Sequence, residues 1–118
     1  MAFFTERRLA VDPALIPPTG DRRRPAPMVD ARAEEAYWRV HYTREPYYER
    51  GYTFEDYLPA YRTGWEGRVR YHGRNFEQAE RELARDYQRN RGNSLLNWRR
   101  NRHAAQAAWE RVDQPLPK

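Results

Sequence analysis

The sequence predicts an all-α fold, a small bundle of three or four short helices with an aromatic core, preceded by an extended N-terminal arm. Four segments carry apolar residues at helical spacing, behind residues that commonly cap helices. Leu, Ile, Val and Phe supply only 17 of 118 residues, so the 9 Tyr and 4 Trp have to provide much of the core. Five of the 9 Pro lie within residues 11–30, where no hydrophobic period is present.

The domain organisation follows from this contrast. A chain of 118 residues is long enough for one domain. We expect residues 1–30 to form an extended arm rich in proline and arginine, and residues 31–118 to form the helical domain. No apolar run approaches the roughly 20 residues needed to cross a membrane. The first residues do not form a convincing signal peptide, so we expect a cytoplasmic protein.

The first predicted helix spans about residues 31–43, with Asp30 as its N-cap. Pro46 prevents it from continuing further. The apolar residues divide between two faces, one with Ala33, Tyr37 and Val40 and the other with Trp38 and Tyr42.

The second predicted helix begins after Thr53, which forms a capping-box-like pair with Asp56 three residues later. Tyr52 and Tyr57 occupy the two positions of a hydrophobic staple around this start. The apolar stripe of the helix consists of Phe54, Leu58, Tyr61, Trp65 and Val69.

Two residues inside this second helix carry predictions of their own. Pro59 lacks the N–H of a helical hydrogen bond, so it should kink the helix near its first turns or make the part before it a separate turn. Gly64 has no Cβ, so another backbone or an aromatic ring should approach it closely.

The third and fourth predicted helices occupy the rest of the domain. The third begins after Asn75, with Gln78 completing its cap, and ends near Arg91 and Gly92. Its apolar stripe consists of Phe76, Ala79, Leu83 and Tyr87. The fourth begins at Asn93 or Ser94, and Pro115 lies beyond its end. Its apolar face consists of Leu95, Trp98, Ala105, Trp109 and Val112.

Arg102 falls on the apolar face of the fourth helix. A charge in such a place has to be paired or to reach water. We expect its side chain to extend to solvent, to pair with an acid at the edge of the core, or to stack on a Trp. In the alternative, this face is turned toward a partner chain.

Residues with catalytic or metal-binding chemistry are sparse. The chain has no Cys, which excludes disulfides, thiol catalysis and thiolate metal sites. His41, His72 and His103 fit no metal-binding spacing. The acid pairs at residues 34–35 and 55–56 fall in the first turns of predicted helices, where the helix dipole favours negative charge. We therefore expect no enzyme activity, no metal and no cofactor.

The leading functional hypothesis is a non-enzymatic interaction or accessory module that docks on a larger protein or assembly. Aromatic residues and Arg are enriched at protein interfaces, and the arm combines apolar and basic residues in a proline-rich sequence. The arm is either a flexible tail or a segment that lies along its own domain or a partner. Its candidate partner-binding residues are Phe3, Phe4, Leu15, Ile16, Arg22, Arg23 and Arg24.

Basic charge supports an alternative function, the binding of RNA, DNA or a ribonucleoprotein. The net charge is +5, and nearly all of the 22 basic residues are Arg. This Arg excess reflects either a GC-rich genome or a preference for contacts with carboxylate and phosphate. The positive excess is concentrated in the last third of the chain. The candidate polyanion-binding residues there are Arg89, Arg91, Arg99, Arg100 and His103.

Three segments of the helical domain carry a resemblance to other proteins. They read AYWRVHY at 36–42, YTFEDYLPAYRTGW at 52–65, and RGNSLLNW at 91–98, which is followed by AAQAAWERV at 104–112. On these segments, the region from Glu35 to Val112 resembles a group of small bacterial proteins without an established activity. The resemblance leaves out the arm. It implies a folded bacterial domain, with no substrate, cofactor or site attached.

Overall fold

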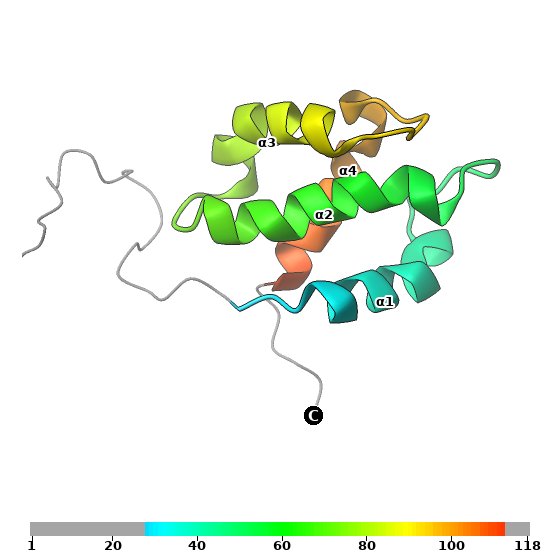
Figure 1. Ribbon diagram of the computed structural model, residues 1–118, viewed down its shortest axis with the longest axis horizontal. Coiled ribbons are helices and arrows are strands. Elements are labelled where there is room, and N and C mark those ends of the chain that lie inside the picture. The colour runs from blue at the N-terminus through cyan, green and yellow to red at the C-terminus, as the bar shows by residue number, and fades with distance from the viewer. Residues whose placement is uncertain (1–27, 113–118) are drawn as a thin grey trace, which may run out of the picture.

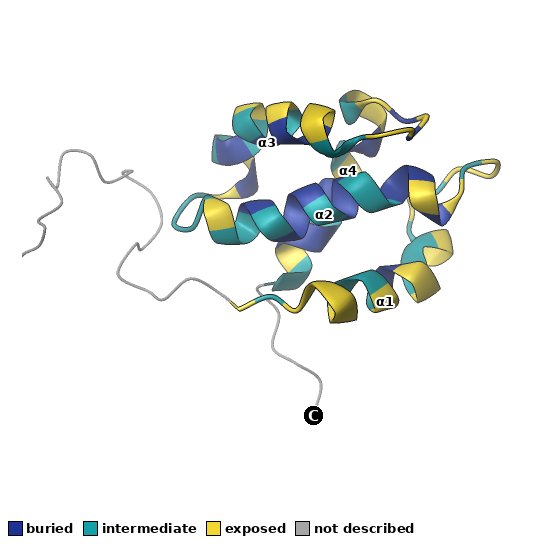
Figure 2. Ribbon diagram, viewed as in Figure 1, coloured by how far each residue is buried: buried dark blue, intermediate teal, exposed yellow. Residues whose placement is uncertain are grey.

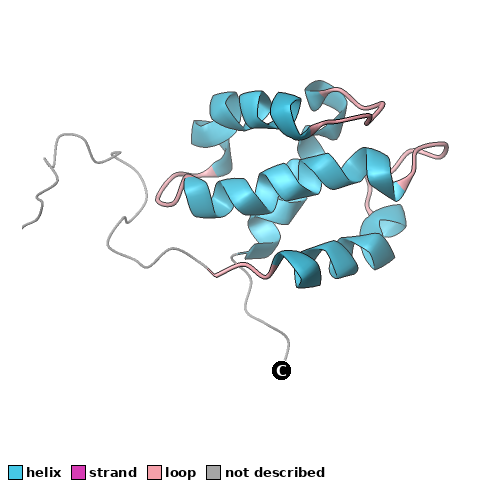
Figure 3. Ribbon diagram, in the orientation of Figure 1, coloured by secondary structure: helices cyan, strands magenta, loops and turns pink. Residues whose placement is uncertain are grey.

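The computed structural model describes residues 28–112, and within that range the chain forms helices joined by short loops (Figure 1, Figure 3). The order is α1 (Ala31–His41), the 3-10 helix η2 (Tyr42–Arg44), α2 (Phe54–Arg70), α3 (Phe76–Asn90) and α4 (Trp98–Val112). These residues contain no strand, which confirms the predicted all-α class. No helix in this range has both the length and the apolar character that a membrane crossing requires.

Helix α2 forms the centre of the bundle (Figure 1). Helices α1 and α3 flank it, while α4 crosses behind it in that view and makes the most extensive contact with it. The contact with α4 is close because Gly64 has no side chain: a Cβ there would lie 2.1 Å from the carbonyl oxygen of Ala105. The predicted approach of another backbone to Gly64 is confirmed.

The core is aromatic, as predicted, and its rings fall into two groups. In the first group, Trp38 of α1 stacks on Tyr61 of α2, with ring centroids 4.4 Å apart and planes at 9°. In the second, Phe76 of α3 meets Trp109 of α4 edge to face at 5.8 Å. Offset stacking and edge-to-face contacts are the favourable arrangements of aromatic rings, so both groups are well packed.

Side-chain caps hold the starts of α1 and α3 where the sequence predicts them. The carboxylate of Asp30 accepts hydrogen bonds from the N–H groups of Arg32 and Ala33, at 3.0 and 3.2 Å. Asn75 and Gln78 form a reciprocal capping box, in which each side chain accepts the other residue's N–H at 2.8 Å. Each cap satisfies backbone donors that a helix start leaves without an intrahelical partner.

The start of α2 combines a cap with a contact between rings. The carboxylate of Asp56 accepts the N–H of Thr53 at 3.0 Å, which is the Asp56 half of the predicted capping box. The rings of Tyr52 and Tyr57 meet edge to face with centroids 6.4 Å apart, which confirms the staple. The helix then runs through Pro59 without interruption, so the alternative of a separate first turn is wrong. Pro59 lies near the helix start, where only one early hydrogen bond is lost.

The loop between α3 and α4 begins as predicted and ends later than predicted. Gly92 follows the end of α3 and adopts a left-handed φ of +56°, which confirms the predicted stop. However, α4 begins at Trp98 and not at residue 93 or 94. The predicted apolar face is also wrong at Leu95, which is 72% exposed, and Leu96 is buried in its place.

A buried polar network explains why α4 starts late. The hydroxyl of Ser94 donates to the backbone carbonyl of Asp56 at 2.6 Å, so it does not cap α4. The side-chain amide of Asn101 donates to the same carbonyl at 3.0 Å and to the Tyr87 hydroxyl at 2.9 Å. The N–H of Leu95 donates to the Asp56 carboxylate at 3.1 Å. The loop is thus tied to the start of α2 and does not continue as helix at residue 94.

Helix α1 buries one of its two predicted faces and exposes most of the other (Figure 2). Trp38 is buried, and Tyr42 is half-buried against the core. On the second face Tyr37 is half-buried, whereas Ala33 and Val40 are exposed. The helical spacing of Ala33 and Val40 therefore does not indicate that this face of α1 belongs to the core.

Arg102 is paired inside the bundle. Its guanidinium donates to the two carboxylate oxygens of Glu80 at 2.7 and 2.9 Å, and lies 5.4 Å from the ring centroid of Phe76. The predicted pairing with an acid at the core edge is confirmed, and the aromatic partner is Phe76 and not a Trp. Ala105 and Trp109 on the same face are buried within the bundle, so the alternative of a face turned toward a partner chain is wrong.

Candidate partner-binding groove

An apolar groove lies between the start of α1 and the second half of α2. Its volume is about 480 Å³. The first wall comes from the entry to α1 and the second from one face of α2. Four of its lining residues are apolar and two are charged: Val29, Ala31, Trp65, Val69, Glu66 and Arg70. An apolar surface with polar groups beside it is the composition found at the centre of protein interfaces.

Local structure holds both walls of the groove in place. Asp30 caps α1, so Val29 directly before it is fixed at the helix entry, where it packs against the core. Trp65 and Val69 are four residues apart and therefore share a face of α2. Trp65 is buried, whereas Val69 is half-buried, so Val69 offers apolar surface that a ligand can still cover.

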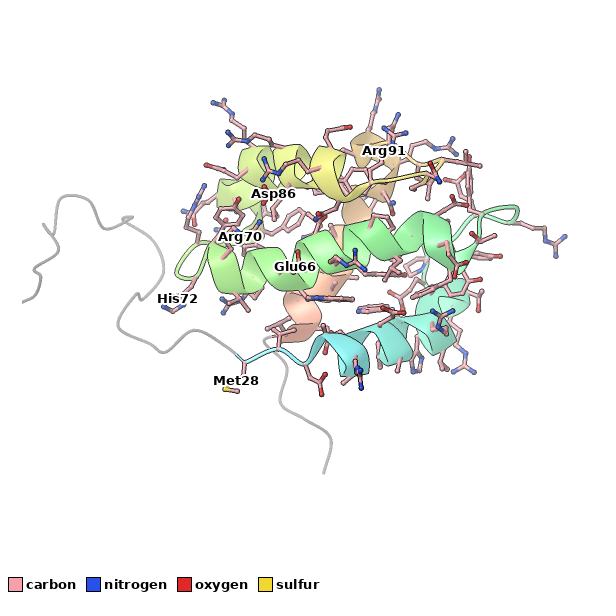
Figure 4. All side chains as sticks on the ribbon, in the orientation of Figure 1. Met28, Glu66, Arg70, His72, Asp86 and Arg91 are labelled. Atoms are coloured by element: carbon pink, nitrogen blue, oxygen red, sulfur yellow. The ribbon has the colours of Figure 1, made fainter. Side chains whose placement is uncertain are left out.

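Arg70 forms an ion pair with Asp86 of α3, and Figure 4 shows the two side chains turned toward each other. The Arg70 guanidinium lies 2.9 Å from the carboxylate of Asp86, which is only 3% exposed. The hydroxyl of Tyr71 donates to the same carboxylate at 2.6 Å, and Arg89 also pairs with it. Burial and then the hydrogen bond to Asp86 raise the pKa of Tyr71, so its hydroxyl stays protonated as a donor.

Glu66 is the unbalanced charge of the groove. It lies on α2 one turn before Arg70 (Figure 4) and is half-buried. Within residues 28–112, no side chain forms an ion pair or a hydrogen bond with its carboxylate. Because Arg70 is directed to Asp86, the groove favours an apolar ligand that carries positive charge beside its apolar part.

Two further hollows on the surface are lined mainly by charged residues. One lies on the outer side of α1 and the other at the start of α3. Part of their charge is matched within the chain, since Arg39 pairs with Glu35 and Arg74 pairs with Glu82, each at 3.1 Å. Both hollows lack the apolar wall of the groove, because they are lined almost entirely by polar side chains.

The predicted arm residues lie outside the described part of the chain: Phe3, Phe4, Leu15, Ile16, Arg22, Arg23 and Arg24. The structure does show where the arm joins the bundle. Met28 is 96% exposed and projects from the chain just before α1 (Figure 4). The next residue, Val29, is part of the groove, so the arm enters the bundle at the candidate site.

The predicted polyanion-binding residues lie in the loop between α3 and α4 or on the helices beside it: Arg89, Arg91, Arg99, Arg100 and His103. Two of the arginines are paired with acids, Arg89 with Asp86 and Arg100 with Glu49. The side chains of Arg99 and His103 are exposed on α4, and neither forms an ion pair with a described residue. This surface therefore carries less free positive charge than its sequence suggests.

The polar groups inside the bundle have structural partners. The hydroxyls of Tyr47 and Tyr61 lie 2.7 Å apart, and burial raises the pKa of both, so both stay protonated at neutral pH. Of the acids at helix starts, Glu34 lies 3.3 Å from Arg111 and Asp56 caps α2. In the part of the chain that the structure describes, no three His, Asp or Glu side chains gather into a set that could hold a metal.

Sequence reasoning misses the groove. The apolar spacing assigns Trp65 and Val69 to the core, although Val69 also faces the groove. Val29 is missed because it belongs to the segment assigned to the arm. One feature of the sequence could have identified Val29: it stands directly before the N-cap Asp30, and an apolar residue at that position commonly packs against the helix that follows.

Comparisons of the chain with models of protein families, with curated proteins and with solved structures found no match. A small helical bundle does not itself fix a function, because function resides in sites and not in folds. The function of this chain is therefore inferred from the geometry and charge of the groove and of the surfaces around it.

Proposed function

We propose that this chain is a non-enzymatic interaction module that docks on a larger protein or assembly in the cytoplasm. The contact surface is the groove together with the arm that joins the bundle beside it. The observation that carries the proposal is the groove itself, with its apolar walls and its unmatched Glu66. The aromatic residues support this function indirectly, because they hold the two walls in a fixed position.

The size of the groove explains why the arm has to take part in binding. A space of about 480 Å³ seats only a few side chains of a partner. A stable protein interface buries at least about 1,200 Å² in total. The remaining contact area has to come from elsewhere, and the apolar and basic residues of the arm are the nearest source along the chain.

A matched pair of substitutions on α1 tests this proposal. Ala31 lines the groove and Ala33 does not, yet both are exposed residues in the first turn of the same helix. A Glu at either position suits the helix dipole, so both variants should fold. We expect A31E to lose the partner that the tagged full-length chain captures from its host, and A33E to retain it. Circular dichroism of both variants checks that helicity is unchanged.

Two results of this capture experiment would contradict the proposal. One is a partner that A31E and A33E retain equally, since the groove would then not be the contact surface. The other is loss of all captured material on nuclease treatment. That second result would favour the alternative function, binding of RNA, DNA or a ribonucleoprotein. The observation that supports this alternative is the exposure of Arg99 and His103 at the start of α4.

A further inference from the structure

We propose that the chain's own arm occupies the groove when no partner is bound, with Leu15 and Ile16 seated against Val29 and Val69. The proposal rests on the groove of the proposed function and adds how access to it is regulated. A partner then has to displace the arm before it binds, so the arm acts as an internal competitor.

The length of the arm and its point of attachment make this arrangement possible. Residues 17–27 separate Ile16 from Met28. A chain spans at most about 3.3–3.6 Å per residue, so this segment reaches roughly 35–40 Å, enough to turn back toward Val29. The entropic cost of closing a loop grows only slowly with its length and is small for a loop this short. The arm thus meets the groove at a high effective concentration.

The chemistry of the arm segment matches the groove. Leu15 and Ile16 are adjacent aliphatic residues followed by Pro17 and Pro18. Proline holds the backbone in an extended form, which lowers the conformational entropy lost when the segment enters an apolar groove. The groove volume of about 480 Å³ is sufficient for two aliphatic side chains.

Charge complementarity supports the same occupant. The cluster at residues 22–24, three consecutive arginines, lies between Ile16 and Met28. An arm seated in the groove brings this cluster within reach of Glu66, whose carboxylate has no partner among the described side chains. The pair Phe3 and Phe4 is a weaker candidate, because it lies farther from Met28 along the chain and is not followed directly by proline.

Paramagnetic relaxation enhancement in the full-length chain tests the proposal. The chain has no Cys, so a single introduced Cys takes a nitroxide label at a defined place. With the label on T19C, we expect loss of the amide peaks of Glu66 and Val69, while the peak of Arg85 on the outer side of α3 remains. A label on A2C, beside the aromatic pair, is the matched control and should leave all three peaks visible.

Two further samples separate the possible origins of peak loss. Replacing Leu15 and Ile16 by Ser in the T19C chain should restore the Glu66 and Val69 peaks. A mixture of spin-labelled chain without 15N and 15N-labelled chain without the spin label should show no loss. Three results would overturn the proposal. The first is that the Glu66 and Val69 peaks persist in every T19C sample, and the second is that the Ser substitutions fail to restore lost peaks. The third is that the peaks are lost in the mixture, because a second copy would then supply the arm.

Failure of this inference can be told apart from failure of the proposed function. Persistent Glu66 and Val69 peaks, combined with capture that A31E abolishes, would reject the internal competitor and keep the partner-binding groove. Selective peak loss, combined with capture that A31E leaves unchanged, would support the docked arm and reject the groove as the partner's contact surface.

Discussion

Gly64 and Gly67 set how closely α2 approaches the helices around it. Each Gly within a helix costs about 1 kcal/mol relative to Ala, because its backbone loses more freedom on folding. In α2 the absent side chains leave room for neighbours: the backbone of Ala105 at Gly64 and the side chain of Leu83 at Gly67. The close contacts that result offset the cost of the two glycines, since dispersion forces act over short distances.

We predict that G64A destabilises the protein more than G67A. The new Cβ at position 64 would lie 2.1 Å from the backbone oxygen of Ala105, which moves only if α4 moves. At position 67 the Cβ would lie 2.3 Å from the end of the Leu83 side chain, which can turn away. Overpacking costs about 1–3 kcal/mol, and the better helix propensity of Ala returns about 1 kcal/mol.

Urea unfolding of the two glycine variants beside the wild type measures this difference. The midpoint should fall clearly for G64A and little for G67A. A G64A variant that is as stable as the wild type would show that α4 can shift away from α2 at no cost, contrary to the close contact that the structure shows.

At the scale of elements, the helices that depend on local interactions are the predictable ones. The starts of α1 and α3 rest on caps formed by residues within three positions of each other, and the sequence shows both. The start of α4 is different, because Ser94 is held by the carbonyl of Asp56, a residue 38 positions earlier. A residue that looks like a cap thus becomes part of a long-range network, which no local pattern reveals.

Helices α3 and α4 are joined by the ion pair of Glu80 and Arg102, and this pair predicts a pH dependence. The hydrogen bond from Arg102 lowers the pKa of Glu80 below its ordinary value of 4.5. The folded state then binds the proton more weakly than the unfolded state. The stabilisation is therefore complete above the ordinary pKa and is lost as the pH falls through the lower, folded pKa.

We accordingly expect E80Q to lower the free energy of unfolding at pH 7. Below about pH 4.5, the free energy of unfolding should fall less steeply with decreasing pH in E80Q than in the wild type. Both side chains are partly exposed, so the loss at pH 7 should be at most about 1 kcal/mol. Urea unfolding at pH 7 and in acid provides the measurement, with E110Q as the control, since Glu110 is exposed, lies outside the groove and forms no ion pair with a described residue. Equal pH profiles for E80Q and E110Q would argue against a stabilising pair.

At the scale of the whole molecule, the sequence reveals the core but not the groove. The aromatic residues at helical spacing in α2 and α3 mark buried positions, so most of the core can be read from the chain, although the same spacing at Tyr37 marks only a half-buried one. The groove needs Val29 and Val69 side by side, and these residues lie in different segments whose approach only the fold determines.

Ion pairs between distant segments are equally invisible, as with Arg100 and Glu49, which lies 51 positions earlier. By contrast, the i,i+3 spacing of Asp86 and Arg89 does predict the pair that they form.

The pairing of charges across the molecule bears on the choice between a protein partner and a nucleic acid. A nucleic-acid contact by Arg99 would contribute to the salt dependence of binding, as each phosphate contact releases counterions. R99E removes an exposed cation at the start of α4, and R85E makes the same charge change on the exposed face of α3. Both substitutions lower the net charge from +5 by two units.

If the groove is the contact surface, R99E and R85E should behave alike. Both should capture the same protein partner as the wild type, because neither residue lines the groove. Both should also show the same small loss of affinity for a single-stranded oligonucleotide at low salt, since only the overall charge has changed. Fluorescence anisotropy across a salt series measures this. A selective loss of affinity in R99E, with a shallower salt slope than in R85E, would assign phosphate binding to the start of α4 and favour the nucleic-acid function over the proposed one.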